Sequence, residues 1–290
     1  MIILLTGASG FLGHEIFDTL KSEHEVITLG RSDSNNIKSD LSHEIPNLPK
    51  SDIIIHAAGK AHTIPKTPEE EKDFFQVNEE GTKNLLKGVK ELPKLFVLIS
   101  TVAVYGVEQG ENISESYALK GVTPYALSKI KAEKVVQEWG ENMGVNVLIF
   151  RLPLIAGPNP PGNLGAMIKA INGGYYFRLG NGLVRKSMVL GRDIAKVIPG
   201  LLGKSGIYNL TDGIHPSLKE LDQYLASLKS KKVKNLPIRP LEIAAKIGDL
   251  VPMFPLNSYR VNKLKYSLTF SDEKARKELN WNPSPVIGNF

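Results

Sequence analysis

The hydrophobic residues in the first half of the chain occur in short runs separated by longer stretches of helical periodicity. Five runs have the length of a buried strand: Met1–Thr6, Glu25–Leu29, Asp52–His56, Leu95–Ser100 and Val145–Phe150. Apolar residues at helical spacing lie between them, over about Phe11–Ser22, Glu70–Lys90 and Pro124–Trp139. This alternation predicts a parallel sheet covered by helices on both faces. Ligands of such sheets bind at the carboxyl ends of the strands.

The pattern changes after residue 151. Four prolines and two glycines between Pro153 and Gly162 predict a rigid loop, because proline fits neither a helix interior nor a central strand. Shorter segments of helical periodicity follow, near Gly165–Asn172, Asp193–Leu202, Ser217–Leu228 and Asp272–Leu279. The chain is therefore predicted to divide near residue 160, with later segments returning to the first part.

The segment Thr6–Gly13 carries glycines at positions 7, 10 and 13 between the first predicted strand and its helix. Gly7 permits a tight turn, Gly10 lets a phosphate approach the backbone, and Gly13 lets the helix pack on the strand. A pyrophosphate would then lie at the helix N-terminus. The pattern predicts a dinucleotide site, with a purely structural turn as the alternative.

The end of the second strand bears on which dinucleotide is bound. A carboxylate at this point would bind the ribose 2′-hydroxyl of NAD, whereas an arginine accommodates the 2′-phosphate of NADP. The chain has Arg31 and Ser32 there, a cation and a hydroxyl that can both bind phosphate. NADP(H) is therefore favoured, and NAD(H) is the alternative if Arg31 is merely solvated.

Tyr125 and Lys129 open a predicted helix four residues apart, so they share one face. A free phenol has a pKa of about 10, and a cation within about 4–6 Å can lower an acid's pKa by about 1–3 units. We therefore expect Lys129 to lower the pKa of Tyr125. Ser100 and Thr101 end the preceding strand, and a hydroxyl there can bind the substrate oxygen that Tyr125 protonates.

The composition is that of a soluble globular protein, with 42% hydrophobic and 23% charged residues. The chain has no cysteine, which excludes disulfides, thiolate metal sites and a cysteine nucleophile. The six histidines show no metal-ligand spacing, so no metal is expected. The apolar run at the N-terminus is far shorter than the ~20 residues of a membrane span. No membrane span and a cytoplasmic location are expected.

The net charge of +6 is unevenly distributed. Residues 1–150 carry 15 basic and 21 acidic side chains, whereas residues 151–290 carry 21 and 9. A basic second half suits an anionic ligand, a nucleic acid or a membrane surface, or is only a solvated surface. The most basic stretch, Lys229–Arg239, lacks interleaved aromatic residues, which argues against nucleic acid. Leu236–Leu256 is apolar and is expected to pack internally, with a membrane or a partner as the alternative.

A set of motifs resembles the extended short-chain dehydrogenase/reductases, specifically the NAD-dependent epimerase/dehydratase family acting on nucleotide sugars. The matching segments, in the family's order, are Thr6–Gly13, Ser39–Leu41, His56–Gly59, Val77–Asn78, Gly81–Thr82, Ser100–Gly106, Tyr125–Lys129, Arg151–Pro158 and Leu268–Pro283. The resemblance implies an α/β fold with a Rossmann-type doubly wound parallel sheet. Residues 1–160 would form the NAD(P)-binding domain and residues 161–290 mainly a small C-terminal substrate-binding domain.

The resemblance also implies roles for individual residues. Thr101, Tyr125 and Lys129 would be catalytic, with Lys129 also holding the nicotinamide ribose. The cofactor would contact Gly7, Ser9, Gly10, Phe11, Leu12, Gly13, Arg31, Ser32, Asp40, Leu41, Ala57, Ala58, Gly59, Tyr125, Lys129 and Pro153. The substrate would contact Thr101, Asn163 and Arg185. Asp40 would lie at the adenine, Pro153 at the nicotinamide and Arg185 at the substrate diphosphate, where Lys186 is the alternative in the register.

Two other residues near the predicted site, Lys60 and His62, are each as readily explained by a solvated loop as by substrate contact, and His56 is interpreted as a core histidine. The chain departs from the family's usual Arg-Pro by having Leu152 between Arg151 and Pro153.

The predicted function is NADP(H)-dependent reduction of a nucleotide-activated 4-keto sugar, of the UDP-4-keto-6-deoxy-N-acetylhexosamine type. A nucleotide-sugar 4-epimerase is the first alternative. A dehydratase is disfavoured, because Val102 and Ala103 stand where that subclass has an Asp-Glu pair. A non-catalytic NAD(P) sensor would not need the intact trio of Thr101, Tyr125 and Lys129. The expected partner is a nucleotide sugar and not a nucleic acid. The sequence leaves the oligomeric state open, and a homodimer is the assembly considered.

Overall fold

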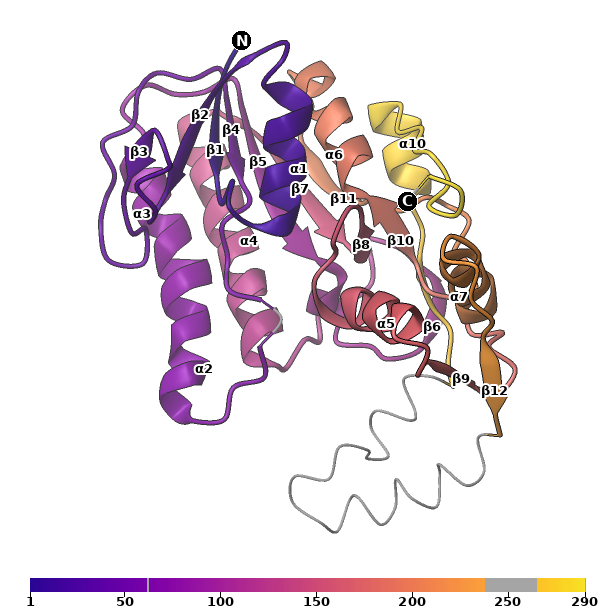
Figure 1. Cartoon of the computed structure of the whole chain (residues 1–290). Helices are drawn as coiled ribbons and strands as arrows, with labels where there is room; N and C mark the ends of the chain where they lie inside the picture. The colour runs from indigo at the N-terminus through magenta and orange to yellow at the C-terminus, as the bar shows by residue number, and fades with distance from the viewer. Residues whose placement is uncertain (62, 238–264, 290) are drawn as a thin grey trace.

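The computed structural model describes residues 1–61, 63–237 and 265–289 (Figure 1). Its centre is a seven-stranded sheet in the order β11-β7-β5-β4-β1-β2-β3, and every neighbouring pair is parallel. The strands are β1 (Ile2–Thr6), β2 (Glu25–Gly30), β3 (Ile37–Lys38), β4 (Ile53–His56), β5 (Leu95–Thr101), β7 (Asn146–Leu152) and β11 (Gly206–Asn209). This is the doubly wound Rossmann order, and the predicted fold class is confirmed.

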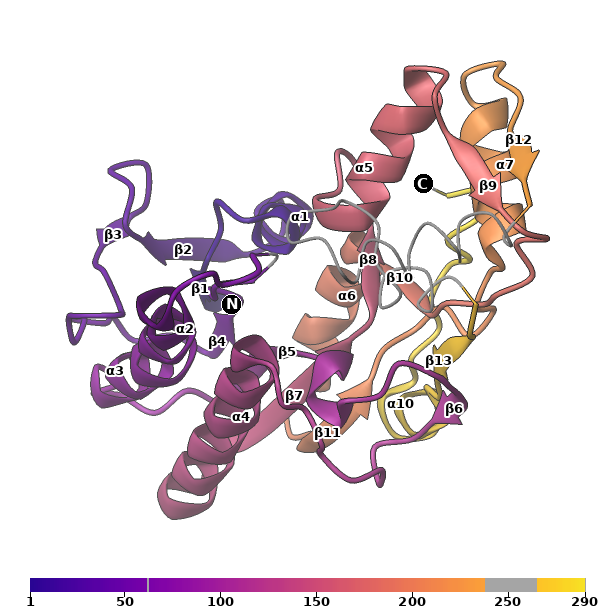
Figure 2. The ribbon, with the colours of Figure 1, turned by 90° about the horizontal axis from the view of Figure 1, so that it is seen from below.

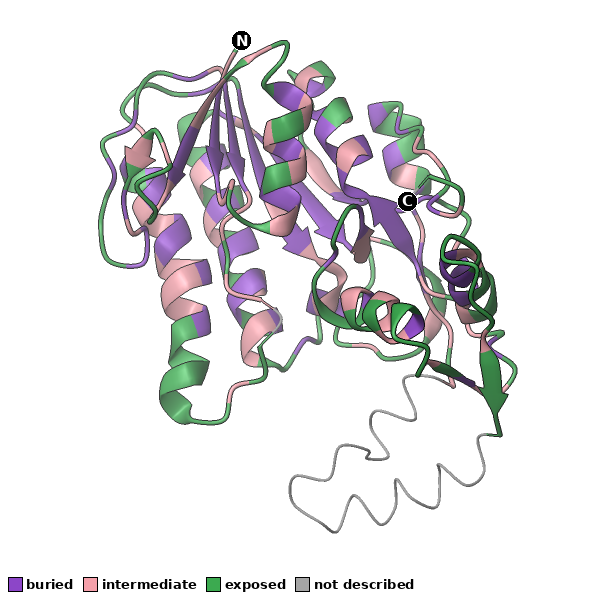
Figure 3. Cartoon of the chain, viewed as in Figure 1, coloured by how far each residue is buried: buried purple, intermediate pink, exposed green. Residues whose placement is uncertain are grey.

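Alternating side chains of the strands supply two apolar layers. Ile3 and Leu5 of β1 pack toward α1 (Phe11–Leu20), α6 (Gly191–Val197) and α10 (Glu273–Leu279). Leu4 packs on the other face, toward α3 (Gly81–Lys87) and α4 (Pro124–Met143). The strands are therefore buried on both sides, which explains why they are continuous apolar runs (Figure 3).

The long helix predicted over Glu70–Lys90 is interrupted. The structure has α2 (Pro68–Phe75), a π-helical turn at Gln76–Glu80, and then α3. Asn78 lies buried in this turn, where its side chain contacts other loops and helices. A wider turn of this kind is common near functional sites, and the continuous helix was the wrong expectation.

A second lobe lies beside the sheet (Figure 2). It has its own apolar cluster, formed by α5 (Gly162–Asn172), α7 (Leu218–Ser227) and the paired strands β8 (Leu154–Ala156) and β10 (Met188–Leu190). Two further parallel pairs complete the described part: β9 (Phe177–Leu179) with β12 (Lys234–Leu236), and β6 (Gly110–Ile113) with β13 (Leu268–Phe270). Short helical turns at Val102–Tyr105 and Ile198–Leu201 follow β5 and α6.

Some sequence predictions lie outside the described residues. Most of Leu236–Leu256 and the side chain of His62 belong to this group. In the part of the chain that the structure describes, no helix is long and apolar enough to cross a membrane.

Candidate functional site

The glycine turn after β1 is closely packed on one side and open on the other. Gly7 has a φ of +76°, and a Cβ there would lie 2.6 Å from the amide nitrogen of Ala58. A Cβ on Gly13 would lie 2.0 Å from the carbonyl oxygen of Gly7. Gly10 is exposed, and a Cβ there would meet only that same oxygen, at 3.2 Å. Packing therefore requires glycine at 7 and 13, while Gly10 keeps the backbone accessible.

The first turn of α1 suits an anion. Its N-cap is Gly10, which offers no side chain to the free amides, and the turn carries no acidic residue. Free amides and the helix dipole together favour a phosphate at this position. Ser9 is exposed beside Gly10, Phe11 is half-buried, and Leu12 is buried in the core. The turn fits the pyrophosphate of a dinucleotide.

A chain of hydrogen bonds fixes the ends of β1 and β4 beside the turn. Thr82 Oγ1 donates to the carbonyl of Asn78 at 2.6 Å, so it accepts from His56 Nε2 at 3.0 Å. His56 Nδ1 then accepts from Thr6 Oγ1 at 2.7 Å, and Thr6 Oγ1 accepts from the amide of Ala58 at 3.1 Å. The network specifies a neutral imidazole protonated on Nε2.

Burial, with a smaller contribution from the Lys129 charge, lowers the pKa of His56 to about 3. His56 is thus a satisfied core histidine, as the sequence indicated. Its bonds hold the backbone of Ala57 and Ala58 against Gly7, and Gly59 follows against the side chain of Asn78.

The predicted adenine end of the site is a polar surface. Arg31 and Ser32 follow β2 and are exposed, and Ser32 Oγ lies 3.0 Å from Ser34 Oγ. The Ser42 hydroxyl, and to a lesser extent the charge of Arg31, hold the pKa of Asp40 below its usual value. The amide of Ser42 also donates to Asp40 at 3.0 Å, while Leu41 is buried beneath. The hydrogen bonds to the Asp40 carboxylate thus come from Ser42, and the exposed guanidinium of Arg31 can bind an anion.

The three predicted catalytic side chains lie at the ends of β5 and α4. The side chain of Thr123 caps α4 and Pro124 opens it, so Tyr125 projects from the first turn. Burial raises the pKa of Tyr125, and a hydrogen bond with Thr101 opposes that rise. The expected lowering of this pKa by Lys129 is therefore wrong for this arrangement, because desolvation dominates. A phenol in this environment stays protonated at neutral pH.

Lys129 is buried and follows Tyr125 by one turn of α4. Its Nζ donates to the carbonyl oxygen of Ile99 in β5 at 2.6 Å, so the ammonium faces the strand end instead of solvent. Burial lowers the pKa of Lys129 to about 8, while the charge of Glu133 opposes this. The ammonium and neutral forms are thus both accessible near physiological pH.

The wall beside Tyr125 combines Asn78, from the motif Val77–Asn78, and Lys60 with two residues to which the sequence gave no role, Phe74 and Ser128. Asn78 Nδ2 donates to Ser128 Oγ at 2.9 Å, and Ser128 Oγ donates to the carbonyl of Tyr125 at 2.8 Å. The ring of Phe74 lies 6.2 Å from that of Tyr125. Lys60 Nζ lies over Phe74 and pairs with Asp73 at 2.9 Å, so its ammonium is already engaged. The spacing between Asn78 and Ser128, 50 residues, left no local sequence signal.

The predicted substrate residues lie around the second lobe. Pro153 separates β7 from β8, and Asn163 is exposed in the first turn of α5. Arg185 is exposed and its Nη1 donates to the carbonyls of Ile214 at 3.2 Å and His215 at 3.0 Å. The alternative, Lys186, donates instead to the carbonyl of Tyr266 at 3.0 Å. Both of these bonds use Nη1, so the Nε and Nη2 hydrogens of Arg185 can bind an anion.

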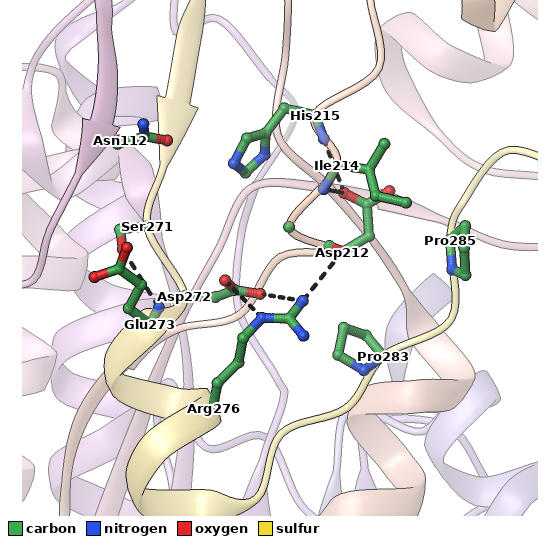
Figure 4. Close-up of a pocket in the computed structure, with 11 residues that line it drawn as sticks. Asn112, Asp212, Ile214, His215, Ser271, Asp272, Glu273, Arg276, Pro283 and Pro285 are labelled. Carbon is green, nitrogen blue, oxygen red and sulfur yellow. Dashed lines mark hydrogen bonds and ion pairs between the residues drawn. The ribbon is translucent and has the colours of Figure 1, made fainter.

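A polar cavity of about 530 Å³ lies elsewhere, between the loop 212–215 and the start of α10 (Figure 4). Two of its charged groups are paired with each other: Arg276 pairs with Asp272 at 3.0 Å and also donates to the carbonyl of Asp212. The Asp212 carboxylate accepts from the amides of Ile214, His215 and Val286. The cavity contains none of the predicted catalytic residues. Among the residues that the structure describes, no group of three His, Asp or Glu side chains could hold a metal ion.

Comparison with known proteins identifies the family of the chain. The family model "NAD dependent epimerase/dehydratase family" matches residues 3–210. The GDP-6-deoxy-D-mannose reductase of Pseudomonas aeruginosa is 29% identical over 248 residues, covering 78% of this chain and 79% of that protein. An Escherichia coli O157:H7 protein named N-acetyl-alpha-D-glucosaminyl-diphospho-ditrans,octacis-undecaprenol 4-epimerase is 27% identical over 249 residues, 81% and 73% of the two chains.

Among solved structures, RMD from Pseudomonas aeruginosa complexed with NADPH superposes with a TM-score of 0.74 at 21% identity, covering 100% of this chain and 96% of that one. This likeness confirms the Rossmann-type fold. Because the family model spans well over half of the residues, the chain belongs to the NAD dependent epimerase/dehydratase family, the group of extended short-chain dehydrogenase/reductases that the sequence motifs indicated.

Proposed function

We propose that the protein is an NADP(H)-dependent reductase of a nucleotide-activated 4-keto sugar. The observation that carries the proposal is the arrangement of Thr101, Tyr125 and Lys129: a protonated phenol is hydrogen-bonded to a strand-end hydroxyl, and a buried lysine follows it by one turn of the same helix. A group that stays protonated at neutral pH suits the donor of a proton to a carbonyl oxygen. The Pseudomonas aeruginosa relative named as a reductase supports the same reaction type.

The chain offers a matched set of groups to the dinucleotide. The first turn of α1, capped by Gly10 and free of acidic residues, offers its amides to a pyrophosphate, and the resemblance assigns Lys129 to the nicotinamide ribose. Arg31 and Ser32 form the exposed cation and hydroxyl for a 2′-phosphate, which favours NADP(H) over NAD(H). When bound, the nicotinamide supplies the hydride acceptor or donor for the reaction.

Three side chains around the substrate's C4 carbonyl would take part in the proton transfer. Thr101, hydrogen-bonded to Tyr125 in this structure, would turn its hydroxyl proton to the substrate oxygen, and Tyr125 would deliver its own proton to that oxygen as the C4 carbon is reduced. The Lys129 ammonium then stabilises the phenolate left on Tyr125. Asn78 and Ser128 fix the backbone of Tyr125, so the phenol is held ready for transfer.

The second lobe would hold the nucleotide part of the substrate. Arg185 has a planar guanidinium that is anchored on the carbonyls of residues 214 and 215 and suits a diphosphate. Asn163 lies in the first turn of α5, directly after the proline-rich loop. The excess of basic over acidic residues after position 150 supports an anionic ligand there. On this basis residues 1–160 mainly bind the dinucleotide and residues 161–290 mainly bind the substrate.

A 4-epimerase is the second candidate, because the Escherichia coli relative carries that name. The two reactions differ in cofactor balance: a reductase consumes one NADPH per turnover, whereas an epimerase returns the hydride it removed and leaves the cofactor unchanged.

The test mixes the purified protein with NADPH and a UDP-4-keto-6-deoxy-N-acetylhexosamine, and follows the absorbance of the reduced nicotinamide. We expect oxidation of NADPH in proportion to sugar reduced. Conversion of UDP-glucose or UDP-N-acetylglucosamine into its 4-epimer, with no net cofactor change, would establish the epimerase instead. Binding of the dinucleotide without either reaction would favour a sensor.

A further inference from the structure

We propose that Glu133 is a positioning residue. Its carboxylate, held by a buried pair with Arg151, orders the catalytic strand ends and supplies the negative charge that allows the buried Lys129 to remain an ammonium ion. The inference rests on the proposed function, in which that ammonium stabilises the Tyr125 phenolate.

Glu133 shares a helix face with the catalytic residues. Tyr125, Lys129 and Glu133 follow one another at intervals of four along α4. Glu133 is 2% exposed and Arg151 is 3% exposed, so both charges are withdrawn from water. Arg151 Nη2 donates to Glu133 Oε2 at 2.7 Å, and its Nε donates to both carboxylate oxygens at 3.2 Å.

The pair connects the elements that carry the site. The hydroxyl of Ser100, the neighbour of Thr101 in β5, donates to Glu133. Arg151 lies in β7 and also donates to the Tyr105 hydroxyl at 3.3 Å, which in turn donates to Asn209 of β11 at 2.7 Å. One carboxylate thus links the strand end that bears Thr101 with the helix that bears Tyr125 and Lys129.

Stability alone does not account for such a pair. Replacing a buried ion pair by apolar groups of similar volume is often neutral or stabilising, because desolvation offsets the attraction between the charges. Both Glu133 oxygens accept hydrogen bonds, so the carboxylate is held in one orientation. A role in the electrostatics of the site explains why a charge is placed there.

The charges that face Lys129 come from four elements. Tyr125 and Glu133 lie on its own helix, and His56 lies at the end of β4. The Ile99 carbonyl of β5 accepts a hydrogen bond from Lys129, and Arg151 of β7 pairs with Glu133. His56 is neutral and Tyr125 is protonated. Of these described groups, Glu133 is the one whose charge favours the ammonium form of Lys129.

The test compares the pH dependence of Glu133→Gln with that of the wild type. Without the carboxylate, Lys129 should lose its proton at lower pH, so the alkaline limb of kcat/KM for reduction should move to lower pH by about one unit. The control is Glu138→Gln, which removes a carboxylate from the exposed face of the same helix and should leave the limb unmoved.

A second measurement needs no substrate. Because the pKa of Lys129 is about 8 when folded and near 10.4 when unfolded, the unfolded chain holds more protons between these values. The free energy of unfolding should therefore rise with pH in this window, and the rise should be absent in Lys129→Met. In Glu133→Gln the rise should begin at lower pH. This result separates failure of the inference from failure of the proposed function.

Glu133→Gln leaves Arg151 as an unpaired buried charge, which destabilises the fold. The double variant Glu133→Gln/Arg151→Met removes both charges and should show a smaller shift in the same direction, because the repulsion between Arg151 and Lys129 is removed as well. If either variant folds and keeps the wild-type position of both pH profiles, the electrostatic role is refuted. If neither folds, the pair is required for folding itself, and the positioning role is likewise rejected.

Discussion

His56 makes the stability of the protein depend on pH in a way that can be calculated. Its imidazole is fully buried between Thr6 and Thr82, with both nitrogens engaged and the proton on Nε2. Adding a second proton would remove the acceptor that Thr6 uses. Folding therefore holds His56 neutral, and acid should unfold the protein by protonating this residue in the unfolded chain.

The magnitude follows from the two pKa values. The pKa of His56 is about 3 in the folded protein, and a free histidine has a pKa of about 6.5. Between these values the unfolded chain binds one more proton than the folded one, so the free energy of unfolding falls as the pH falls. Between pH 7 and pH 5 this one residue should remove about 2 kcal/mol of stability.

Urea unfolding at several pH values between 7 and 5 measures this loss. The variant His56→Gln offers one donor and one acceptor in place of the neutral imidazole but cannot titrate. Between pH 7 and pH 5 its free energy of unfolding should therefore fall by about 2 kcal/mol less than that of the wild type. The matched control, His43→Gln, changes an exposed imidazole and should retain the wild-type slope. Equal slopes for His56→Gln and wild type would refute the assignment of a buried, neutral His56.

Three further substitutions test other parts of the account. Gly13→Ala should destabilise the protein by about 1–3 kcal/mol in urea unfolding, because its Cβ would meet the Gly7 carbonyl at 2.0 Å. The control Gly200→Ala, whose Cβ would meet nothing within 4 Å, should change the stability little, and equal effects of the two would contradict the packing argument. Arg31→Ala should weaken NADPH binding about 10-fold or more with little change for NADH in calorimetric titration, and equal losses would reject the 2′-phosphate site. Arg185→Gln should weaken UDP binding while leaving NADPH binding intact; unchanged UDP affinity would remove Arg185 from the substrate site.

The central strands could be predicted because burial on both faces leaves continuous apolar runs in the sequence. Residues Ile3, Leu4 and Leu5 are all fully buried, although they alternate between two helical layers. The edge strands β3 and β11 were missed, since β3 has two residues and β11 has four with mixed polarity. Short edge strands bury too little apolar surface to leave a pattern.

Candidate site residues could be proposed from the sequence where neighbours in sequence are also neighbours in space. Tyr125 and Lys129 share a helix face, and the glycine turn is a single segment. The pair of Glu133 with Arg151 was not predictable, because charged residues on a helix and a strand 18 positions apart are usually solvated, and only the fold buries them together. The raised pKa of Tyr125 likewise depends on its burial, which the local sequence does not reveal.

The most direct test of the central claim follows the hydride itself. The protein is given NADPH that carries deuterium at the transferred position, together with a UDP-4-keto-6-deoxy-N-acetylhexosamine, and the sugar product is examined by mass spectrometry. The account predicts one deuterium at C4 for each NADPH oxidised, and a rate reduced by about 10²–10⁴ in Tyr125→Phe although the variant still binds NADPH. An unlabelled 4-epimer formed from a UDP-hexose without net NADPH oxidation, or an undiminished rate in Tyr125→Phe, would contradict it.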